Sequence, residues 1–219
     1  MLPWYQPLFS NAAAHTVSGG GGPSYTTWDP SNTSGGVTLS GGNLVYTGTL
    51  YTAGGDSTRS IANHSSGKYY MELTVTAIVS GNIWALGFGV CNSSFVLTNA
   101  PLAGNANSAG VFLAGDGNFY LNNAPTSVGM TFASGDIIGL AADLDNKKVW
   151  LRQNGGAWNG SGNPATNTGG FDISALQGSG AVYVVGYTDW PNTGPYPVAT
   201  ANFGASSYGT AAPSGFGNW

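Results

Sequence analysis

The chain has 219 residues, of which 42% are hydrophobic and only 6% are charged, and its net charge is −4. This hydrophobic fraction supports a folded core, and the low charge excludes disorder driven by charge repulsion. Five scattered lysines and arginines cannot form the basic patch that neutralises phosphates, so the sequence predicts no nucleic-acid partner.

The first 17 residues are rich in bulky apolar side chains and carry no Asp, Glu, Lys or Arg. Pro3 and Pro7 disfavour both a helix and a central strand, and residues 19–22 are four glycines that suit a flexible tether. We expect residues 1–24 to form an N-terminal arm that anchors the chain to another protein. The alternative is that the arm packs on its own domain. The expected anchor residues are Leu2, Trp4, Tyr5, Leu8 and Phe9.

The start of the chain lacks the features of a secretion signal. The first basic residue is Arg59, so no positively charged region precedes an apolar stretch. No run approaches the roughly 20 apolar residues that cross a bilayer. The sequence therefore predicts no membrane insertion, and export would need another route, such as assembly into a particle.

From residue 25 onward, short apolar runs alternate with turn residues. Residues 37–39 and 43–46 flank Ser-Gly-Gly, which is a hairpin signal. Residues 68–76 alternate most regularly, so one face of this strand is expected in the core. Residues 83–90 have large side chains on one face and small ones on the other, which indicates a strand covered on both faces.

The second half of the chain is predicted to contain two further hairpins. Gly115-Asp116-Gly117 separates one pair of strands. In residues 135–155 the other pair flanks the turn at residues 145–148, and Ile138, Leu140, Ala142 and Leu144 share one face. Later strands are expected at 182–187 and 199–203, with a helical turn near 171–176. Residues 25–219 are thus predicted to be one all-β domain, a two-sheet antiparallel sandwich of the jelly-roll type.

Several segments resemble the SPRY family. The chain has Gly-Lys-Tyr-Tyr-Met-Glu-Leu where the family has a strand of the form GKYYFEV, and Trp-Ala-Leu-Gly-Phe-Gly-Val where it has RIGFGV. The resemblance covers residues 25–219 in order and implies a concanavalin-like β-sandwich that binds partners through its loops. The matching segments are 67–73, 84–90, 135–139, 143–146, 153–155, 196–197, 202–204 and 213–216.

Two departures from the family pattern bear on this resemblance. Lys147 stands where members often have Gly after the Asp-Asn of the central hairpin. The chain is also poorer in charge than the eukaryotic members that bind peptides or proteins. Its Gly-, Ser- and Asn-rich composition is similar to that of the versions found in bacteriophage structural proteins.

The sequence offers little support for catalysis, for a metal or for a cofactor. Asp143 and Asp145 share a strand face and, with Asn146, offer oxygen ligands or a carboxylate pair, but such residues usually order their own turn. His15 and His64 lie far apart in the sequence, and Cys91 is the only cysteine. We therefore expect no enzyme, no metal site and no cofactor.

Two loops contain the aromatic and polar side chains that sugar sites use. One is the loop at 154–170, and the other is the loop at 188–197 together with the strand end before it. The alternative is that these side chains fold over the sheet ends or fill subunit contacts. The candidate ligand-binding residues are Trp158, Asn159, Tyr187, Asp189, Trp190 and Tyr196.

Three functions follow from these observations. The first is a bacteriophage virion protein on the head or tail surface, whose arm docks on other virion proteins while the sandwich binds a host-surface glycan or another virion protein. The second is a soluble SPRY-type module that binds a peptide or protein. The third is a carbohydrate-active enzyme that uses Asp143. An apolar arm and neutral faces also make a homo-oligomer plausible.

Overall fold

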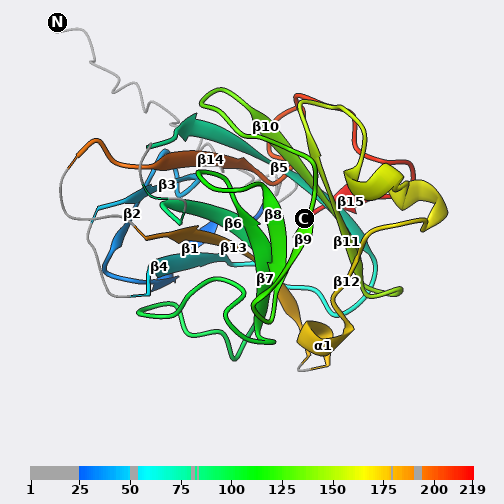
Figure 1. Cartoon of the computed structure of the whole chain (residues 1–219), viewed down its shortest axis with the longest axis horizontal. Coiled ribbons are helices and arrows are strands. Elements are labelled where there is room, and N and C mark those ends of the chain that lie inside the picture. The colour runs from blue at the N-terminus through cyan, green and yellow to red at the C-terminus, as the bar shows by residue number, and fades with distance from the viewer. Residues whose placement is uncertain (1–24, 50–53, 80–81, 83, 179, 190–193) are drawn as a thin grey trace, which may run out of the picture.

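The computed structural model describes residues 25–49, 54–79, 82, 84–178, 180–189 and 194–219. In these ranges, strands form two sheets that pack face to face, and a short helix lies at one edge (Figure 1). The all-β sandwich predicted from the sequence is therefore confirmed. The expected anchor residues Leu2, Trp4, Tyr5, Leu8 and Phe9 lie outside the described residues.

Sheet A has seven strands, and all of its neighbouring strands are antiparallel. In spatial order the strands are β1 (Trp28–Thr33), β4 (Asp56–Ser60), β13 (Val182–Thr188), β6 (Leu86–Asn92), β7 (Ser108–Phe112), β8 (Asn118–Leu121) and β9 (Ala124–Ser127).

Sheet B has eight strands, seven of which follow one antiparallel path. The C-terminal strand, β15 (Gly217–Asn218), pairs with β5 in parallel. In spatial order the seven are β12 (Phe171–Asp172), β11 (Lys148–Gln153), β10 (Ile137–Asp143), β5 (Lys68–Ala77), β14 (Val198–Asn202), β3 (Val45–Gly48) and β2 (Val37–Ser40). The helix is α1 (Ser174–Gln177), and two 3-10 turns, η1 (Asn159–Ser161) and η2 (Pro164–Thr166), precede it.

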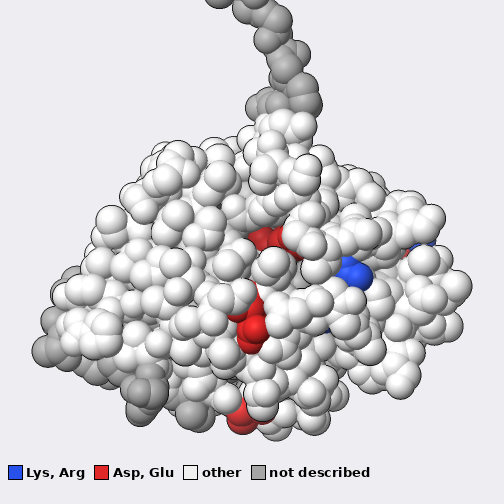
Figure 2. All heavy atoms as spheres, turned by 90° about the horizontal axis from the view of Figure 1, so that it is seen from above, with Lys and Arg blue, Asp and Glu red and all other residues white. Residues whose placement is uncertain are grey.

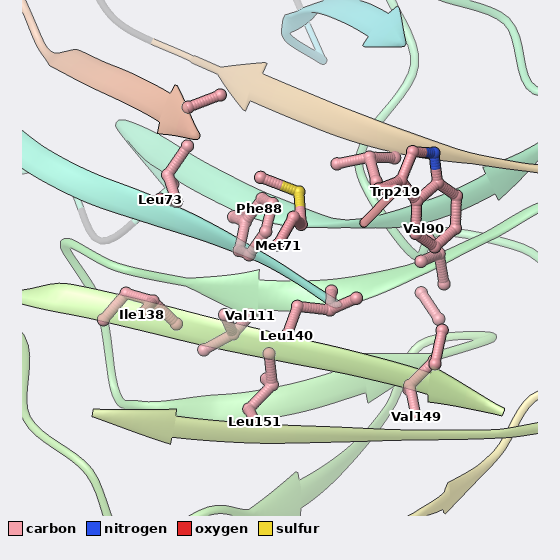
Figure 3. Packing of buried hydrophobic residues seen from close by; sticks show 14 of the residues in the cluster. Met71, Leu73, Phe88, Val90, Val111, Ile138, Leu140, Val149, Leu151 and Trp219 are labelled. Carbon is pink, nitrogen blue, oxygen red and sulfur yellow. The ribbon is translucent and has the colours of Figure 1, made fainter. Parts of the chain in front are cut away.

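The main core lies between the two sheets and follows the period-two pattern of the strands. Met71 and Leu73 of β5 and Leu140 of β10 face Phe88 of β6 and Val111 of β7 across the sandwich (Figure 3). Ile138, Ala142 and Leu144, predicted on the core face of the central hairpin, are buried in the same cluster. The hairpin pattern read from the sequence is therefore confirmed.

The turn of the central hairpin uses its own polar side chains. Asp143 accepts hydrogen bonds from the backbone N–H and side chain of Asn146 at 3.0 and 2.8 Å, and its Oδ2 lies 3.1 Å from Lys68 Nζ. Asp145 accepts a 2.9 Å bond from the Gly67 N–H. Lys147 takes the left-handed conformation, with φ = 56°, at the position where the family often has Gly. These acidic residues therefore order the turn.

The two faces of β6 differ as the sequence indicated. Phe88 and Val90 enter the main core, whereas Gly87 faces a segment that folds over the outside of sheet A. A Cβ at Gly87 would lie 3.0 Å from Leu102 in that segment, so the glycine permits the close approach. The strand begins at Leu86, later than predicted, so Trp84 precedes it in a turn.

Candidate functional site

A hollow of about 250 Å³ opens on the outer face of sheet A, away from the main core. Its floor comes from β13 and β7, and its rim comes from β8, the turn before β6 and the segment at 93–107, which folds over the sheet. We call this hollow the aromatic pocket. It is lined by Gly54, Trp84, Pro101, Leu102, Phe112, Tyr120, Asn123, Tyr187 and Asp189.

Four rings build the walls of the aromatic pocket. Trp84 packs edge to face against Phe112, with ring centroids 4.4 Å apart and planes at 89°. Tyr120 contacts both of these rings at 5.8 and 5.4 Å, with planes at 65° and 69°. Tyr187 meets Phe112 at 5.6 Å and 77°. Because neighbouring planes lie at 65–89° to one another, the rings pack edge to face and do not form a flat platform.

The backbone makes room for Tyr187 at two glycines. Tyr187 pairs with Gly87 across β13 and β6, and a Cβ at Gly87 would lie 3.0 Å from its ring. Gly55 has φ = 90°, and a Cβ there would lie 2.4 Å from the same ring. Larger residues at either position would displace the tyrosine, so the shape of the pocket is already set by the sheet register and these glycines.

Asn82 ties the rim of the pocket together. Its side-chain oxygen accepts a 2.9 Å bond from the Trp84 N–H, and its amide donates a 2.6 Å bond to the carbonyl of Asp189. The first bond is an Asx turn, which replaces the extended backbone that the sequence pattern predicted at this point. It holds Trp84 beside Asp189, with 37% of the tryptophan surface exposed.

The polar groups of the pocket differ in how they are satisfied. The hydroxyls of Tyr120 and Tyr187 already donate, to Asp116 Oδ2 at 2.6 Å and to the carbonyl of Gly54 at 3.2 Å. Asp189 Oδ1 is buried and has no hydrogen-bond partner among the described residues. Burial raises the pKa of Asp189, and the nearby Asp56 carboxylate raises it further. A buried carboxylate oxygen without a partner calls for an explanation, and a hydrogen bond or ion pair with a ligand would supply one.

Asp116 behaves differently from Asp189. Although burial alone raises the pKa of the Asp116 carboxyl, hydrogen bonds from Tyr120 and Asn118 outweigh that effect and lower it. The same bond to Asp116 raises the pKa of the Tyr120 hydroxyl. Asp116 therefore orients the Tyr120 ring and stays ionised at neutral pH.

The loop at 154–170, which contains the predicted ligand residues Trp158 and Asn159, lies on the opposite side of the molecule, over the outer face of sheet B. Trp158 is half-buried there and packs edge to face on Tyr70 at 6.3 Å, and the Arg152 guanidinium lies 4.5 Å from its ring centroid. Asn159 is buried and its side-chain oxygen accepts a 2.8 Å bond from the Leu151 N–H. These two residues hold the loop on the sheet.

A polar network accompanies Trp158 on sheet B. Glu72 is only 3% exposed, and it accepts bonds from the backbone of Gly209 at 2.6 Å and Thr210 at 2.8 Å, and from the Tyr70 hydroxyl at 2.9 Å. Arg152 donates to Tyr70 at 3.1 Å and to the hydroxyl of Thr210 at 3.0 Å. The network fastens the C-terminal segment over the sheet.

The structure thus separates the six predicted ligand residues. Tyr187 and Asp189 line the aromatic pocket, whereas Trp158 and Asn159 lie over sheet B. Tyr196 is 37% exposed and does not line the aromatic pocket. Trp190 lies outside the described residues. The sequence reasoning did not select the remaining polar and aromatic residues of the pocket, which are Trp84, Phe112, Tyr120 and Asn123.

A second hollow, of about 480 Å³, lies where the described chain begins, and we call it the N-terminal groove. Tyr25, Ile61, His64 and Trp219 line it. The His64 ring stacks on Tyr69 with centroids 3.7 Å apart, and its Nε2 is buried without a partner among the described residues. Burial lowers the pKa of His64. The groove is apolar and open.

Figure 2 shows one face of the molecule, on which only a few acidic and basic side chains interrupt the uncharged surface. Across the described ranges, no group of three or more His, Cys, Asp or Glu side chains is placed to hold a metal ion. Cys91 is buried, and burial raises the pKa of its thiol to about 12. No helix in the described part of the chain is long and apolar enough to cross a membrane.

No family model and no curated protein matches this sequence. Among solved structures, the SPRY domain of human HERC1 is similar, with a TM-score of 0.57 and 16% identity over 80% of this chain and 96% of that domain. The TRIM65 PSpry domain gives a TM-score of 0.55 and 11% identity over 82% and 90% of the two chains. Stonustoxin gives 0.56 and 17% over 82% of this chain and 27% of the toxin.

Sequence identities in this range show the fold alone. The chain therefore has the β-sandwich of SPRY domains, and the fold implied by the sequence motifs is confirmed. The motif strands occupy central places in this sandwich, because β5 and β10 pair with each other in the middle of sheet B. A fold of this kind does not by itself fix what the domain binds.

Proposed function

We propose that this chain is a non-enzymatic recognition module that binds part of a partner molecule in the aromatic pocket. The observation that carries the proposal is the buried Asp189 oxygen without a partner, set beside four rings in an open hollow. A concave, mostly apolar site with a few polar groups is where small ligands and side chains bind. SPRY-type sandwiches supply a rigid frame for it.

The placement of the carboxylates supports binding over catalysis. A glycosidase holds two carboxyl groups about 5–10 Å apart on either side of the bond it cleaves. Among the described residues, Asp189 is the only carboxylate that lines the aromatic pocket. Asp56 is 1% exposed, pairs with Thr188 across the strands and accepts a 2.5 Å bond from Ser34, so it is not presented to a substrate. Asp143 is held by Lys68 and Asn146.

A binding screen tests the proposal. The full chain is applied to a glycan array and to a displayed peptide library, with Trp84→Ala as the pocket variant and Trp158→Ala as the matched control on sheet B. We expect ligands that are kept by the wild type and by Trp158→Ala but lost by Trp84→Ala. Ligands that depend on Trp158 and not on Trp84 would place recognition on the other face and contradict the proposal.

A second proposal concerns the setting in which the module works. The sequence of the arm, with Leu2, Trp4, Tyr5, Leu8 and Phe9 before a glycine tether, favours an anchor on a larger assembly. The setting proposed for it is the surface of a bacteriophage head or tail. There the arm docks on other virion proteins, and the sandwich faces a host-surface glycan or a further virion protein. The neutral surface suits such display.

Sedimentation of the full chain tests the anchor. Changing Trp4, Leu8 and Phe9 together to Asp removes the apolar character of the arm and leaves residues 25–219 unchanged. If the arm is an anchor, the wild type self-associates or binds particles and the triple variant sediments as a monomer. A matched variant with Gly20→Ser keeps the wild-type behaviour. Identical monomers in all three cases would favour a free-standing module.

A further inference from the structure

We infer that the aromatic pocket takes a methylated ammonium group, that is, a cation whose nitrogen carries methyl groups in place of hydrogens. The inference rests on the proposed function and names the chemistry of its ligand. It is drawn from the charge of the lining, the arrangement of the rings and the number of hydrogen-bond acceptors that remain available.

The charge of the lining favours a cation. Among the nine described residues that line the pocket, Asp189 is the one carboxylate, and none is Lys, Arg or His. Asp116 adds a second carboxylate directly behind the Tyr120 hydroxyl. Among the described residues, the pocket therefore has a negative lining with no built-in cation to neutralise it.

The rings add a second attraction for a cation. The face of an aromatic ring carries negative potential, and a cation within about 6 Å of the centroid is attracted to it. Trp84, Phe112, Tyr120 and Tyr187 stand at 65–89° to their ring neighbours. Trp84 and Tyr120 are the more exposed of the four rings, and their planes stand at 65° to each other. They can therefore contact a compact cation from two sides, whereas a flat sugar ring prefers a single platform.

The hydrogen-bond inventory selects the kind of cation. A primary ammonium brings three donors and a guanidinium five, and each buried donor needs an acceptor. Asp189 Oδ1 is the buried pocket oxygen without a partner in the described structure, whereas the Gly54 carbonyl and Asp116 already accept from the tyrosines. A dimethylated ammonium brings one donor and a trimethylated one brings none, so one carboxylate oxygen is sufficient. A volume of about 250 Å³ suits such a head group, since drug-sized ligands occupy roughly 300–1,000 Å³.

The inference is tested by calorimetric titration of the full chain at near-physiological salt with two probes of matched shape. Choline carries the methylated ammonium, and 3,3-dimethylbutan-1-ol replaces its nitrogen with carbon and has no charge. We expect choline to bind roughly tenfold more tightly than the alcohol, in line with a cation–π and carboxylate contribution. Phosphocholine and the amide of Nε-trimethyl-lysine are then compared, which distinguishes a lipid or polymer head group from a modified protein.

Two variants separate the charge from the rings. Asp189→Asn keeps the shape of the side chain, and we expect it to weaken choline about five- to tenfold while binding of the neutral alcohol stays the same. Trp84→Ala weakens both probes because it removes a wall. Trp158→Ala, on sheet B, serves as the matched control and leaves both affinities unchanged.

The outcomes distinguish this inference from the proposed function. Equal affinity for choline and for the neutral alcohol would show that the pocket does not select a cation, and so would binding of N-acetylglucosamine in their place. The pocket would then still be a recognition site, but for another ligand. The same holds if Asp189→Asn weakens both probes alike. If no probe binds and Trp84→Ala changes nothing in the glycan and peptide screens, both the inference and the proposed function fail.

Discussion

The outer faces of the two sheets are covered in contrasting ways. Over sheet B, the C-terminal segment is fastened by Glu72, whose two carboxylate oxygens accept bonds from Tyr70, Gly209 and Thr210. Over sheet A, the segment at 93–107 leaves a hollow in which one oxygen of Asp189 is unpaired among the described residues. Both faces carry aromatic rings and a carboxylate, so residue type alone does not separate structure from recognition.

The difference lies in how completely the two carboxylates, Glu72 and Asp189, are hydrogen-bonded. A buried carboxylate that accepts several bonds stabilises the fold, and its removal leaves the former donors without a partner. A buried carboxylate with an unpaired oxygen lowers the stability of the free protein, and a ligand that pairs with this oxygen offsets the loss when it binds. Variants on the two faces are therefore expected to affect different properties, stability on sheet B and binding on sheet A.

The largest effect is expected for Glu72→Ala. This change leaves the Tyr70 hydroxyl and the N–H groups of Gly209 and Thr210 without their acceptor, which we expect to lower the free energy of unfolding by about 3 kcal/mol. Urea denaturation of the full chain measures it. Glu72→Gln keeps one carbonyl oxygen in place and is expected to cost less. A Glu72→Ala variant as stable as the wild type would show that the network does not hold the C-terminal segment.

A smaller effect on stability is expected for Trp84→Ala. Trp84 is partly exposed and loses contacts with Phe112 and Tyr120, so we expect a decrease of only about 1 kcal/mol in the free energy of unfolding. Its effect on binding is expected to be the larger one. The comparison between the two faces breaks down if urea denaturation shows that Trp84→Ala destabilises the protein as much as Glu72→Ala does.

The two faces also differ in how far the sequence predicted them. The core faces of β5 and β10 followed from strict alternation, because a residue two positions along a strand points the same way. The motif strands supported the same arrangement. The buried position of Glu72 is not contained in that pattern, since its partners at Gly209 and Thr210 lie about 140 residues further along the chain.

The aromatic pocket was only partly predictable for a related reason. Tyr187 and Asp189 stood out as an aromatic residue and a carboxylate at the end of a predicted strand. Trp84 continued the large–small alternation of the next strand, and the pattern therefore placed it in the core. Asn82, two residues before it, was the available signal, because an Asx turn interrupts an extended run. The contact of Trp84 with Phe112 and Tyr120 depends on strand register across β6, β7 and β8, which a single sequence does not contain.

The smallest effect is expected at the N-terminal groove, which belongs to neither outer face. Burial lowers the pKa of His64, so the folded protein binds a proton there less readily than the unfolded chain does. The stability that His64 contributes is present above the unfolded pKa of about 6.5 and is lost as the pH falls through the lower, folded pKa. We therefore expect the free energy of unfolding to decrease between about pH 7 and pH 5.

Urea denaturation at several pH values isolates this contribution. His64→Phe keeps a ring against Tyr69 and removes the titration, so its stability is expected to change less over this range. His15→Gln, which removes the other histidine of the chain, is the matched control and keeps the wild-type slope. Asp189 has the opposite effect on the pH dependence of stability. Its pKa is raised in the folded protein, so its ionisation lowers the free energy of unfolding as the pH rises. The urea series is therefore repeated with Asp189→Asn added to the wild type and to His64→Phe, which removes the contribution of Asp189. An unchanged slope in His64→Phe would mean that His64 titrates like a histidine in water.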